Sequence, residues 1–323
     1  MMERVVDPLA RQRSVWRQQS ETIAFVVMMV ALFVAPFVTY PLFVMQALCF
    51  ALFACAFNLL IGYVGLLSFG HALYFGWASY LSAHAAKVWG LPPELVILTG
   101  TATAAALGIV AGSLAIRRQG IYFAMITLAL AQMMYFVALR MKFTGGEDGI
   151  QAVPRGTLFG LFDLRNDMTM YVVVLVVFLA GMLFIHRIIH SPFGEVLKAI
   201  RENETRAISL GYKTDRYKLL AFVLSATLAG VAGSTKAILL GIASLTDVNW
   251  PMSGEVVLMS LVGGLGTIFG PVVGSFVILA MQYKLAFLGE WVLVIQGVIF
   301  VACVLLFRRG IIGELSNWLR IRL

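Results

Sequence analysis

Charged residues are scarce in this sequence, and their scarcity excludes an ordinary soluble protein. Asp, Glu, Lys and Arg make up 12% of the 323 residues, whereas 61% are hydrophobic and the mean hydropathy is +0.92. The apolar runs are too long for the strands of a soluble core. The weakly alternating segments of roughly 10 residues that are typical of transmembrane barrels are missing too. The composition therefore predicts an all-α integral membrane protein.

Several chemical signatures are also missing. The three cysteines lie inside apolar runs without disulfide or metal-binding spacing, and we expect the four histidines to hold no metal. The sequence contains no G-x-x-x-x-G-K-[ST] phosphate loop, no G-x-S-x-G elbow and no H-E-x-x-H helix. We therefore expect neither an enzyme nor a cofactor in this chain, and any ATP-driven activity would need an ATPase on another polypeptide.

Basic residues cluster beside the apolar runs, as the positive-inside rule describes. Four arginines in residues 1–20 predict a cytoplasmic tail. With that tail inside, Arg117-Arg118 and the charged stretch from Ser191 fall inside, and the polar loop 140–166 falls outside. The apolar runs predict membrane spans at about 21–40, 42–61, 66–88, 94–116, 119–139, 169–189, 217–241 and 285–307.

The segment 253–283 must return to the side from which it came, because the last span ends at Arg308-Arg309 on the inner side. Its centre, VGGLGTIFGP, cannot form a straight helix without a large cost, and each flank is shorter than the roughly 20 residues of a span. We expect a broken, re-entrant pair of half-helices beside about eight spans. The transmembrane domain would cover 21–310, followed by a cytoplasmic tail at 311–323.

Polar and glycine residues inside the apolar runs are the candidate lining of a path through the membrane. Polar groups are costly against lipid, and broken helices expose backbone groups that only protein or water can receive. The alternative is an interhelical hydrogen bond for each polar residue and close helix packing for each glycine. Packing is the role predicted for the small residues of the 217–241 span. The candidate path residues are Asn58, Ser68, His71, Thr127, Gln132, Glu255, Gly263, Gly264 and Gly266, with His71 and Glu255 foremost.

The stretch 191–218 is the longest strongly polar segment of the second half of the chain. Pro192 suits a first helical turn, Glu195 lies near the positive end of the helix dipole, and Gly211 offers a stop. Apolar residues recur between them at helical spacing, which predicts an amphipathic helix. Such a helix between two spans is either a passive surface helix or a docking element for another protein.

From about residue 58 to residue 314, the sequence resembles the inner-membrane permease subunits of the branched-chain amino acid ABC importers, in particular the LivM-like type. Five collinear motifs carry the resemblance, and together they are far more specific than any one of them. They are NLLIGYVGLLSFGHALYFG, GIYFAMITLALAQ, TGGEDGI, SPFGEVLKAIRENETRAISLGYKTDRYKLLAFVLSATLAGVAG and LVGGLGTIFGPVVGSF.

The resemblance implies a heteromeric importer in a bacterial inner membrane. Its other members would be a sister permease, two cytoplasmic ATPase subunits that use ATP and Mg, and a periplasmic substrate-binding protein. The stretch 191–218 would be the coupling loop that fits an ATPase subunit, although it departs from a plain E-A-A-x-x-x-G spacing. The resemblance assigns this coupling role to Glu195, Arg201, Glu202, Asn203, Glu204 and Gly211. Branched-chain or related amino acids are the expected substrates.

Two other classes of protein remain as alternatives. A self-sufficient secondary transporter or channel for a small polar solute would use His71, Lys236 and Glu255 as an ion or proton site. Such a protein has no need of an ATPase docking helix, which the stretch 191–218 supplies. A membrane-embedded enzyme would need clustered catalytic groups, and the sequence pattern indicates none.

Overall fold

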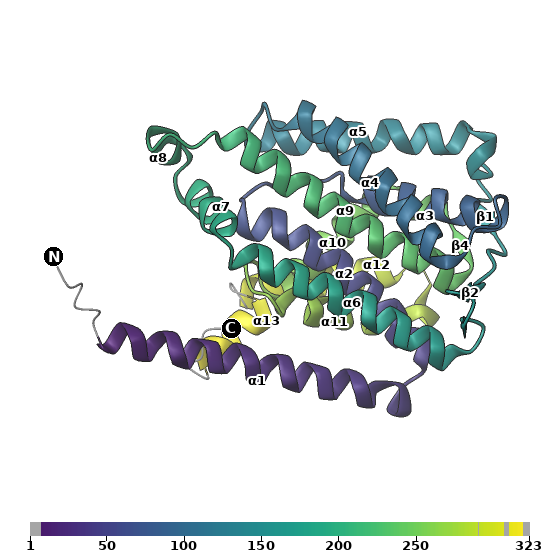
Figure 1. The fold of residues 1–323 in the computed structure, drawn as a ribbon, viewed down its shortest axis with the longest axis horizontal. Coiled ribbons are helices and arrows are strands. Elements are labelled where there is room, and N and C mark those ends of the chain that lie inside the picture. The colour runs from purple at the N-terminus through teal and green to yellow at the C-terminus, as the bar shows by residue number, and fades with distance from the viewer. Residues whose placement is uncertain (1–7, 290, 307–309, 319–323) are drawn as a thin grey trace.

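The computed structural model describes residues 8–289, 291–306 and 310–318, and most of this part of the chain is helical (Figure 1). The α-helices, in chain order, are α1 (Pro8–Val38), α2 (Pro41–Tyr63), α3 (His71–Lys87), α4 (Pro93–Ala115), α5 (Ile121–Arg140), α6 (Asp167–Ile189), α7 (Pro192–Glu202), α8 (Glu204–Ser209), α9 (Thr214–Leu240), α10 (Trp250–Gly263), α11 (Gly270–Leu285), α12 (Trp291–Leu306) and α13 (Gly310–Trp318). The short elements between them are η1 (Lys142–Thr144), η2 (Leu245–Asp247), η3 (Ala286–Leu288), β1 (Ile150–Gln151), β2 (Thr157–Leu158), β3 (Phe162–Asp163) and β4 (Ile242–Ala243).

Helix α2 forms the centre of the bundle. Nearly all of its side chains from Val44 onward are buried, and it packs against α6, α9, α10 and α11. Helices α4, α5 and α6 bury only part of their surface and leave large apolar side chains exposed. Five helices, α2, α4, α5, α6 and α9, are long and apolar enough to cross a membrane. The predicted class, an all-α integral membrane protein, is confirmed.

The two ends of the bundle differ chemically. At one end Gln119, in the turn between α4 and α5, donates Nε2 to Glu204 Oε2 at 2.9 Å, so the Arg117-Arg118 turn and the charged stretch meet there. At the other end, strand β1 pairs antiparallel with β4, and Lys87 Nζ donates to Gln151 O at 2.8 Å. The basic turn and the polar loop 140–166 therefore lie at opposite ends, which we call the inner and the outer end.

Small residues bring α3, α4 and α9 into close contact. A Cβ on Gly230 would lie 2.3 Å from the Cβ of Ala104, and one on Gly108 would lie 2.8 Å from the Cβ of Ala226. A Cβ on Gly233 would meet the backbone oxygen of Phe75 at 2.1 Å. These positions have room only for glycine, so the packing role predicted for the small residues of this span is confirmed.

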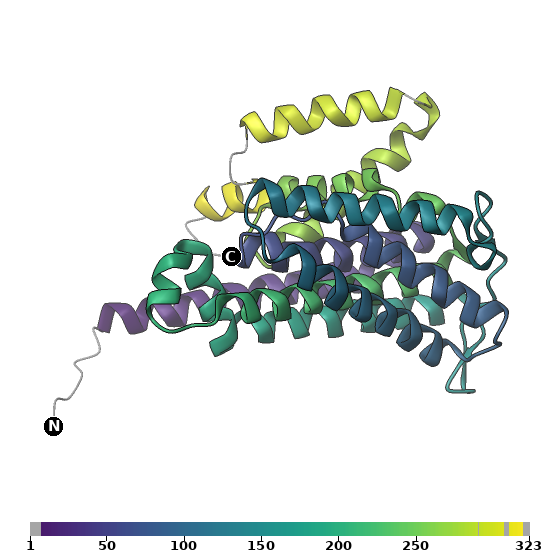
Figure 2. The same ribbon diagram turned by 90° about the horizontal axis from the view of Figure 1, so that it is seen from above.

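The segment 250–285 forms two short antiparallel helices, α10 and α11, with a glycine-rich turn between them. The helices touch along their length, because a Cβ on Gly263 would lie 1.8 Å from Gly270 O and one on Gly274 would lie 1.8 Å from Met259 O. Helix α10 begins close to Asp247 at the outer end, and the turn reaches α7 at the inner end. The predicted broken hairpin is thus observed. Beyond it, α12 stands away from the main bundle (Figure 2).

Several boundaries differ from the prediction. Helix α3 begins at His71 rather than at residue 66, because residues 64–70 form an irregular loop in which Gly65 has φ +82°. Helix α1 runs without a break across residue 20, and α13 spans the predicted start of the second tail. Residues 1–7 and Arg308-Arg309, on which part of the predicted orientation depends, lie outside the described residues. The number of membrane crossings stays a prediction.

Candidate coupling junction and membrane path

The charged stretch folds as two short helices, α7 and α8, at the inner end of the bundle. Ser191 caps α7, its Oγ accepting from Gly194 N at 3.3 Å, and Asn203 caps α8, its Oδ1 accepting from Arg206 N at 2.9 Å. Asn203 is also the residue at which α7 ends, with φ −159°. Asn strongly favours the N-cap because its side chain satisfies an orphan backbone N–H. The cap therefore explains why the single predicted helix is divided in two.

Glu204 fastens α8 to its neighbours. Its Oε1 accepts from Lys218 Nζ in an ion pair and from Thr214 Oγ1 at 3.1 Å, both on α9. Its Oε2 accepts from Gln119 in the α4–α5 turn, as described above. Lys218 is almost fully buried, and this carboxylate is its ion-pair partner. Glu204, one of the six predicted coupling residues, therefore also connects α8 to α9 and to the α4–α5 turn.

Arg201, near the end of α7, is exposed as a residue, but its guanidinium reaches the last turn of α2. Its guanidinium donates to the backbone oxygen of Gly62 in the last turn of α2. A Cβ on Gly65 would lie 3.3 Å from Arg201 Cγ, and one on Gly266 in the hairpin turn would lie 3.4 Å from Arg201 Nη1. The same side chain thus bonds to α2 and lies close to the loop 64–70 and the hairpin turn.

Asn58 on α2 holds the hairpin turn in place. Its Nδ2 donates to Thr267 O at 2.8 Å, and its Oδ1 accepts from Gly266 N at 3.0 Å. Gly264 and Gly266, with φ +124° and +75°, adopt backbone conformations that L side chains rarely reach. Four of the predicted path residues, Asn58, Gly263, Gly264 and Gly266, therefore meet in one junction beside α7. We call this set, with Arg201 and Gly62, the coupling junction.

A second group of predicted path residues lies around the start of α3. Thr127 Oγ1 accepts from Phe69 N at 3.2 Å, in the loop that also contains the fully buried Ser68. His71 Nε2 lies 2.8 Å from Ser225 Oγ on α9. Aromatic rings surround His71 on several sides. His71 thus links α3 to α9 and Thr127 links α5 to the loop 64–70, whereas Ser68 accepts from Gly70 N within that loop.

Glu255 and Gln132 are separate from both groups. Gln282 Nε2 on α11 donates to Glu255 Oε1 on α10, so this pair bridges the two arms of the hairpin. Gln132 Oε1 on α5 is buried without a hydrogen-bond partner among the described residues. Both side chains are only half-buried as residues, and both remain candidates for the lining of a path.

Lys236 forms a buried ion pair that the sequence did not predict. Its Nζ contacts Asp247 Oδ1, with 7% and 2% of the two side chains exposed, and lies 5.7 Å from the centre of the Phe75 ring. Lys236, His71 and Glu255, which a secondary transporter would combine in one ion site, thus each have a different hydrogen-bonding partner. The signal that could have revealed the pair is Asp247 itself, an acid that follows an apolar span carrying one buried lysine.

The outward side of the charged stretch carries both charged and apolar groups. Glu195 pairs with Lys198 at 2.7 Å, and Glu202 and Gly211 are exposed. Three exposed apolar side chains, Ile208, Leu210 and Tyr212, follow within and after α8 at the inner end. Ile208 and Tyr212 were not singled out in the sequence, and Leu210 was expected in the apolar stripe of the helix.

Comparison with known proteins also indicates a membrane transport subunit. A family model described as the permease component of branched-chain amino acid transport systems matches residues 41–304. The chain belongs to this permease family. The match spans the central helix α2, the charged stretch and the α10–α11 hairpin, and it confirms the resemblance that the five motifs indicated.

Three relatives are 26–30% identical to the permease over the aligned residues. It is 26% identical over 288 residues to the high-affinity branched-chain amino acid transport system permease protein LivM of Escherichia coli K12, which covers 82% of this chain and 68% of that protein. It is 27% identical over 178 residues to a probable permease protein LivH of Methanocaldococcus jannaschii, covering 51% and 53% of the two chains. The ribose import permease protein RbsC of Bacillus subtilis is 30% identical over 202 residues, covering 56% and 58%. No solved structure matches the chain.

Proposed function

We propose that this permease is one membrane subunit of an ATP-driven importer for branched-chain or related amino acids in a bacterial inner membrane. Two separate cytoplasmic ATPase subunits drive it with ATP and Mg, a sister permease completes the path, and a periplasmic protein delivers the substrate. The family and the names of the LivM relatives support the substrate class. The ribose permease among the relatives means that the solute has to be measured rather than read from the family.

The observation that carries the proposal is the coupling junction. A helix between two membrane spans can transmit movement only if its side chains contact the membrane helices that have to move. Helix α7 lies between α6 and α9, Glu204 ties α8 to α9, and Arg201 touches both α2 and the hairpin turn. A push on α7 or α8 from an ATPase subunit would therefore reach the central helix and the glycine-rich hairpin directly.

The proposed path uses the residues that the sequence analysis selected, and different groups of them move and support the path. Asn58, Gly263, Gly264 and Gly266 form the moving junction, while Ser68, His71 and Thr127 hold the loop 64–70 against it. Glu255 and Gln132 are half-buried and can face the sister permease or the solute. In this scheme, closure of the ATPases shifts the hairpin relative to α2 and opens the path on one side of the membrane.

The test is a pull-down of the detergent-solubilised chain from its native membrane, followed by mass spectrometry and reconstitution. Recovery of two ATPase subunits and a second permease, with ATP-dependent uptake of labelled leucine after reconstitution, would support the proposal. A chain that is recovered alone and still moves solute without ATP would contradict it and favour a secondary transporter. Competition by unlabelled isoleucine, valine and ribose would then define the substrate class.

A further inference from the structure

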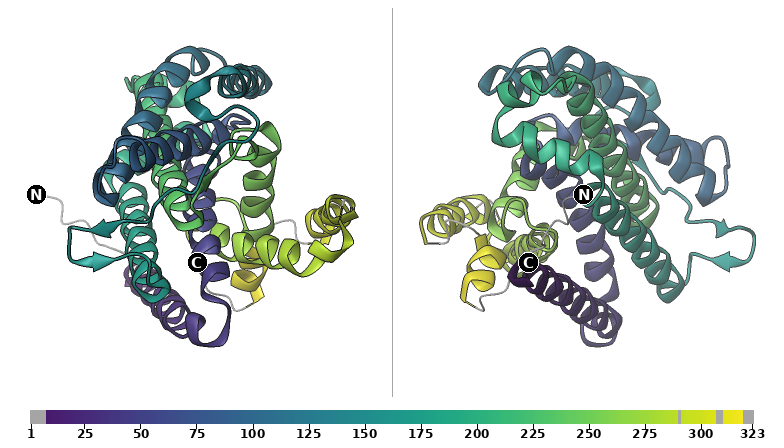
Figure 3. Two further views of the ribbon diagram at one scale, coloured as in Figure 1. Left: turned by 90° about the vertical axis from the view of Figure 1, so that its right-hand side faces the viewer. Right: turned by 60° about the vertical axis from the view of Figure 1, so that its left-hand side comes forward.

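At the outer end, strands β2 and β3 form a small hairpin that projects from the helical bundle. Leu158 pairs with Phe162, and Thr157 pairs with Asp163. In the view along the helices from the outer end, the hairpin extends sideways past α6 rather than away from the membrane (Figure 3, left). It therefore projects across the direction of the helices, in contact with the outer ends of α4 and α6.

The tip of this hairpin is apolar and exposed. Phe159, Leu161 and Phe162 are 67%, 81% and 55% exposed. Large apolar side chains at such exposure on one short hairpin indicate a contact with something outside the chain. A pocket of about 310 Å³ lies at the base of the hairpin, and none of the three residues lines it.

Turn geometry does not explain the phenylalanine at the tip. Leu161 N donates to Leu158 O at 3.1 Å, and the two central residues of this turn, Phe159 and Gly160, have φ +51° and +70°. Turns with positive φ at both central residues favour Asn or Asp followed by Gly. A side chain that suits the turn poorly is therefore present for what it contacts.

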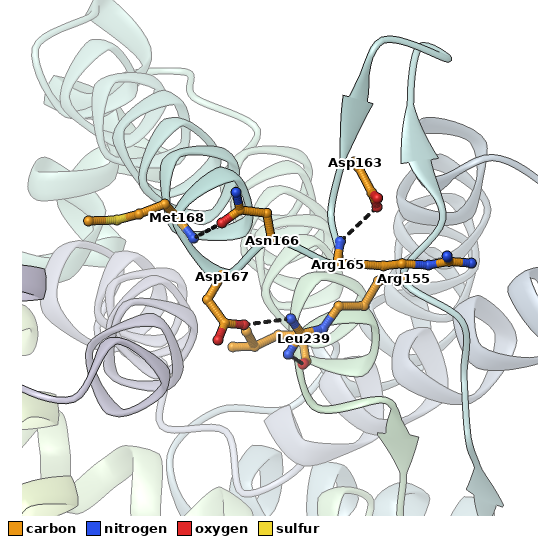
Figure 4. A network of polar contacts seen from close by, with 7 residues as sticks. All are labelled: Arg155, Asp163, Arg165, Asn166, Asp167, Met168 and Leu239. Atoms are coloured by element: carbon orange, nitrogen blue, oxygen red, sulfur yellow. Dashed lines mark hydrogen bonds and ion pairs between the residues drawn. The ribbon is translucent and has the colours of Figure 1, made fainter.

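The base of the hairpin is held firmly, as Figure 4 shows. Arg155 Nη1 contacts Asp167 Oδ1 at 2.8 Å, and its Nη2 donates to Leu239 O at 3.0 Å. At the tip, the backbone N of Phe159 donates to Glu94 Oε2 at 3.3 Å, at the start of α4. These contacts join the hairpin to the outer ends of α4, α6 and α9, so its orientation is fixed by the bundle.

We propose that the β2–β3 hairpin is an interfacial membrane anchor whose apolar tip inserts among the lipid headgroups of the outer leaflet. A two-stranded hairpin has unpaired backbone edges that hydrocarbon cannot satisfy, which limits its depth to the headgroup region. Aromatic side chains are favoured at that level. The hairpin contacts the outer ends of α4 and α6, whose exposed apolar side chains would face lipid, so its tip would reach the bilayer surface next to them. The proposal does not depend on the transported solute or on the ATPase.

Fluorescent labelling at single cysteines tests the anchor in vesicles of phosphatidylethanolamine and phosphatidylglycerol. Leu161→Cys and Phe162→Cys are labelled with bimane in full-length protein carrying Cys303→Ala, because Cys49 and Cys55 are buried. Asp148→Cys is the matched control, since Asp148 is exposed in the other part of the outer loop. Quenching is measured with a nitroxide on the lipid headgroup and with aqueous iodide.

The anchor predicts blue-shifted emission at positions 161 and 162, strong quenching by the lipid nitroxide and protection from iodide. The control position should show the opposite pattern. Quenching of position 161 by iodide as strong as that of position 148 would overturn the anchor. Protection that arises only after the periplasmic binding protein is added would overturn it as well, in favour of a protein-docking hairpin.

Discussion

Arg201 links α7 to both α2 and the hairpin turn. It donates to Gly62 O at the end of α2 and lies against Gly266 in the hairpin turn. Hydrogen bonds of charged groups contribute about 1.5–3 kcal/mol each. If this contact transmits movement, its loss should loosen the coupling without unfolding the protein.

We therefore predict that Arg201→Ala lowers leucine uptake by about tenfold in the reconstituted complex while ATP hydrolysis continues, because about 1.4 kcal/mol corresponds to a factor of ten. Arg201→Lys should recover part of the uptake. Lys142→Ala, an exposed basic residue at the outer end, is the control. A single substitution is more informative than replacing Arg201, Glu202 and Glu204 together, because removal of Glu204 would also leave Lys218 buried without its partner. Uptake and hydrolysis that fall in parallel would contradict the transmission role.

Lys236 and Asp247 give a second prediction at the scale of residues. Removing one member of a buried ion pair leaves an uncompensated charge and destabilises a protein by about 3–5 kcal/mol. Lys236→Met and Asp247→Asn should each lower the temperature of unfolding in detergent, whereas the double variant should lie closer to the wild type than either. Strictly additive losses in this double-mutant cycle would show that the two side chains do not interact energetically.

At the scale of elements, the α10–α11 hairpin depends on glycine where its two arms touch. A methyl group on Gly263 would lie 1.8 Å from Gly270 O, so the backbone would have to shift. Gly254, on the same helix, has open space around its Cβ position. The two positions form a matched pair for testing the packing of the hairpin.

We expect Gly263→Ala to lower the free energy of unfolding by about 1–3 kcal/mol or more, as overpacked sites do. Gly254→Ala should be neutral or raise it by up to about 1 kcal/mol, since it removes a glycine from a helix interior. Thermal unfolding in lipid nanodiscs measures both. Equal effects of the two substitutions would mean that the arms of the hairpin do not pack as closely as described.

The hairpin and the charged stretch also show how far the sequence could predict the structure. Glycine spacing, basic residues and apolar runs determine local breaks and sides of the membrane, and they predicted the two-helix hairpin and the helical charged stretch. The later start of α3 at His71 was not predicted, because loop 64–70 is apolar and reads like the span that follows it. Contacts such as that of Arg201 with Gly62, or of Lys236 with Asp247, join side chains through tertiary packing, which periodicity does not encode.

At the scale of the whole molecule, the chain presents three surfaces with different chemistry. The inner end carries charge together with exposed Ile208, Leu210 and Tyr212, the sides of α4, α5 and α6 are apolar, and the outer end carries the polar loop and the β2–β3 hairpin. A membrane protein that acts alone does not need exposed apolar side chains on a firmly held surface at its inner end. We call this surface, Ile208, Leu210 and Tyr212, the inner platform. The proposed ATPase subunit is the partner that explains it.

The most direct test of this account places a photocrosslinking amino acid on that platform. Ile208 is replaced by p-benzoylphenylalanine, with Asp148 at the outer end as the control position, and the complex is irradiated in its native membrane. The account predicts a crosslink from position 208 to an ATPase subunit, strengthened or weakened by ATP, and none from position 148. If position 208 crosslinks only to lipid while uptake remains intact, the charged stretch is a passive surface helix and the ATP-driven mechanism proposed here is wrong.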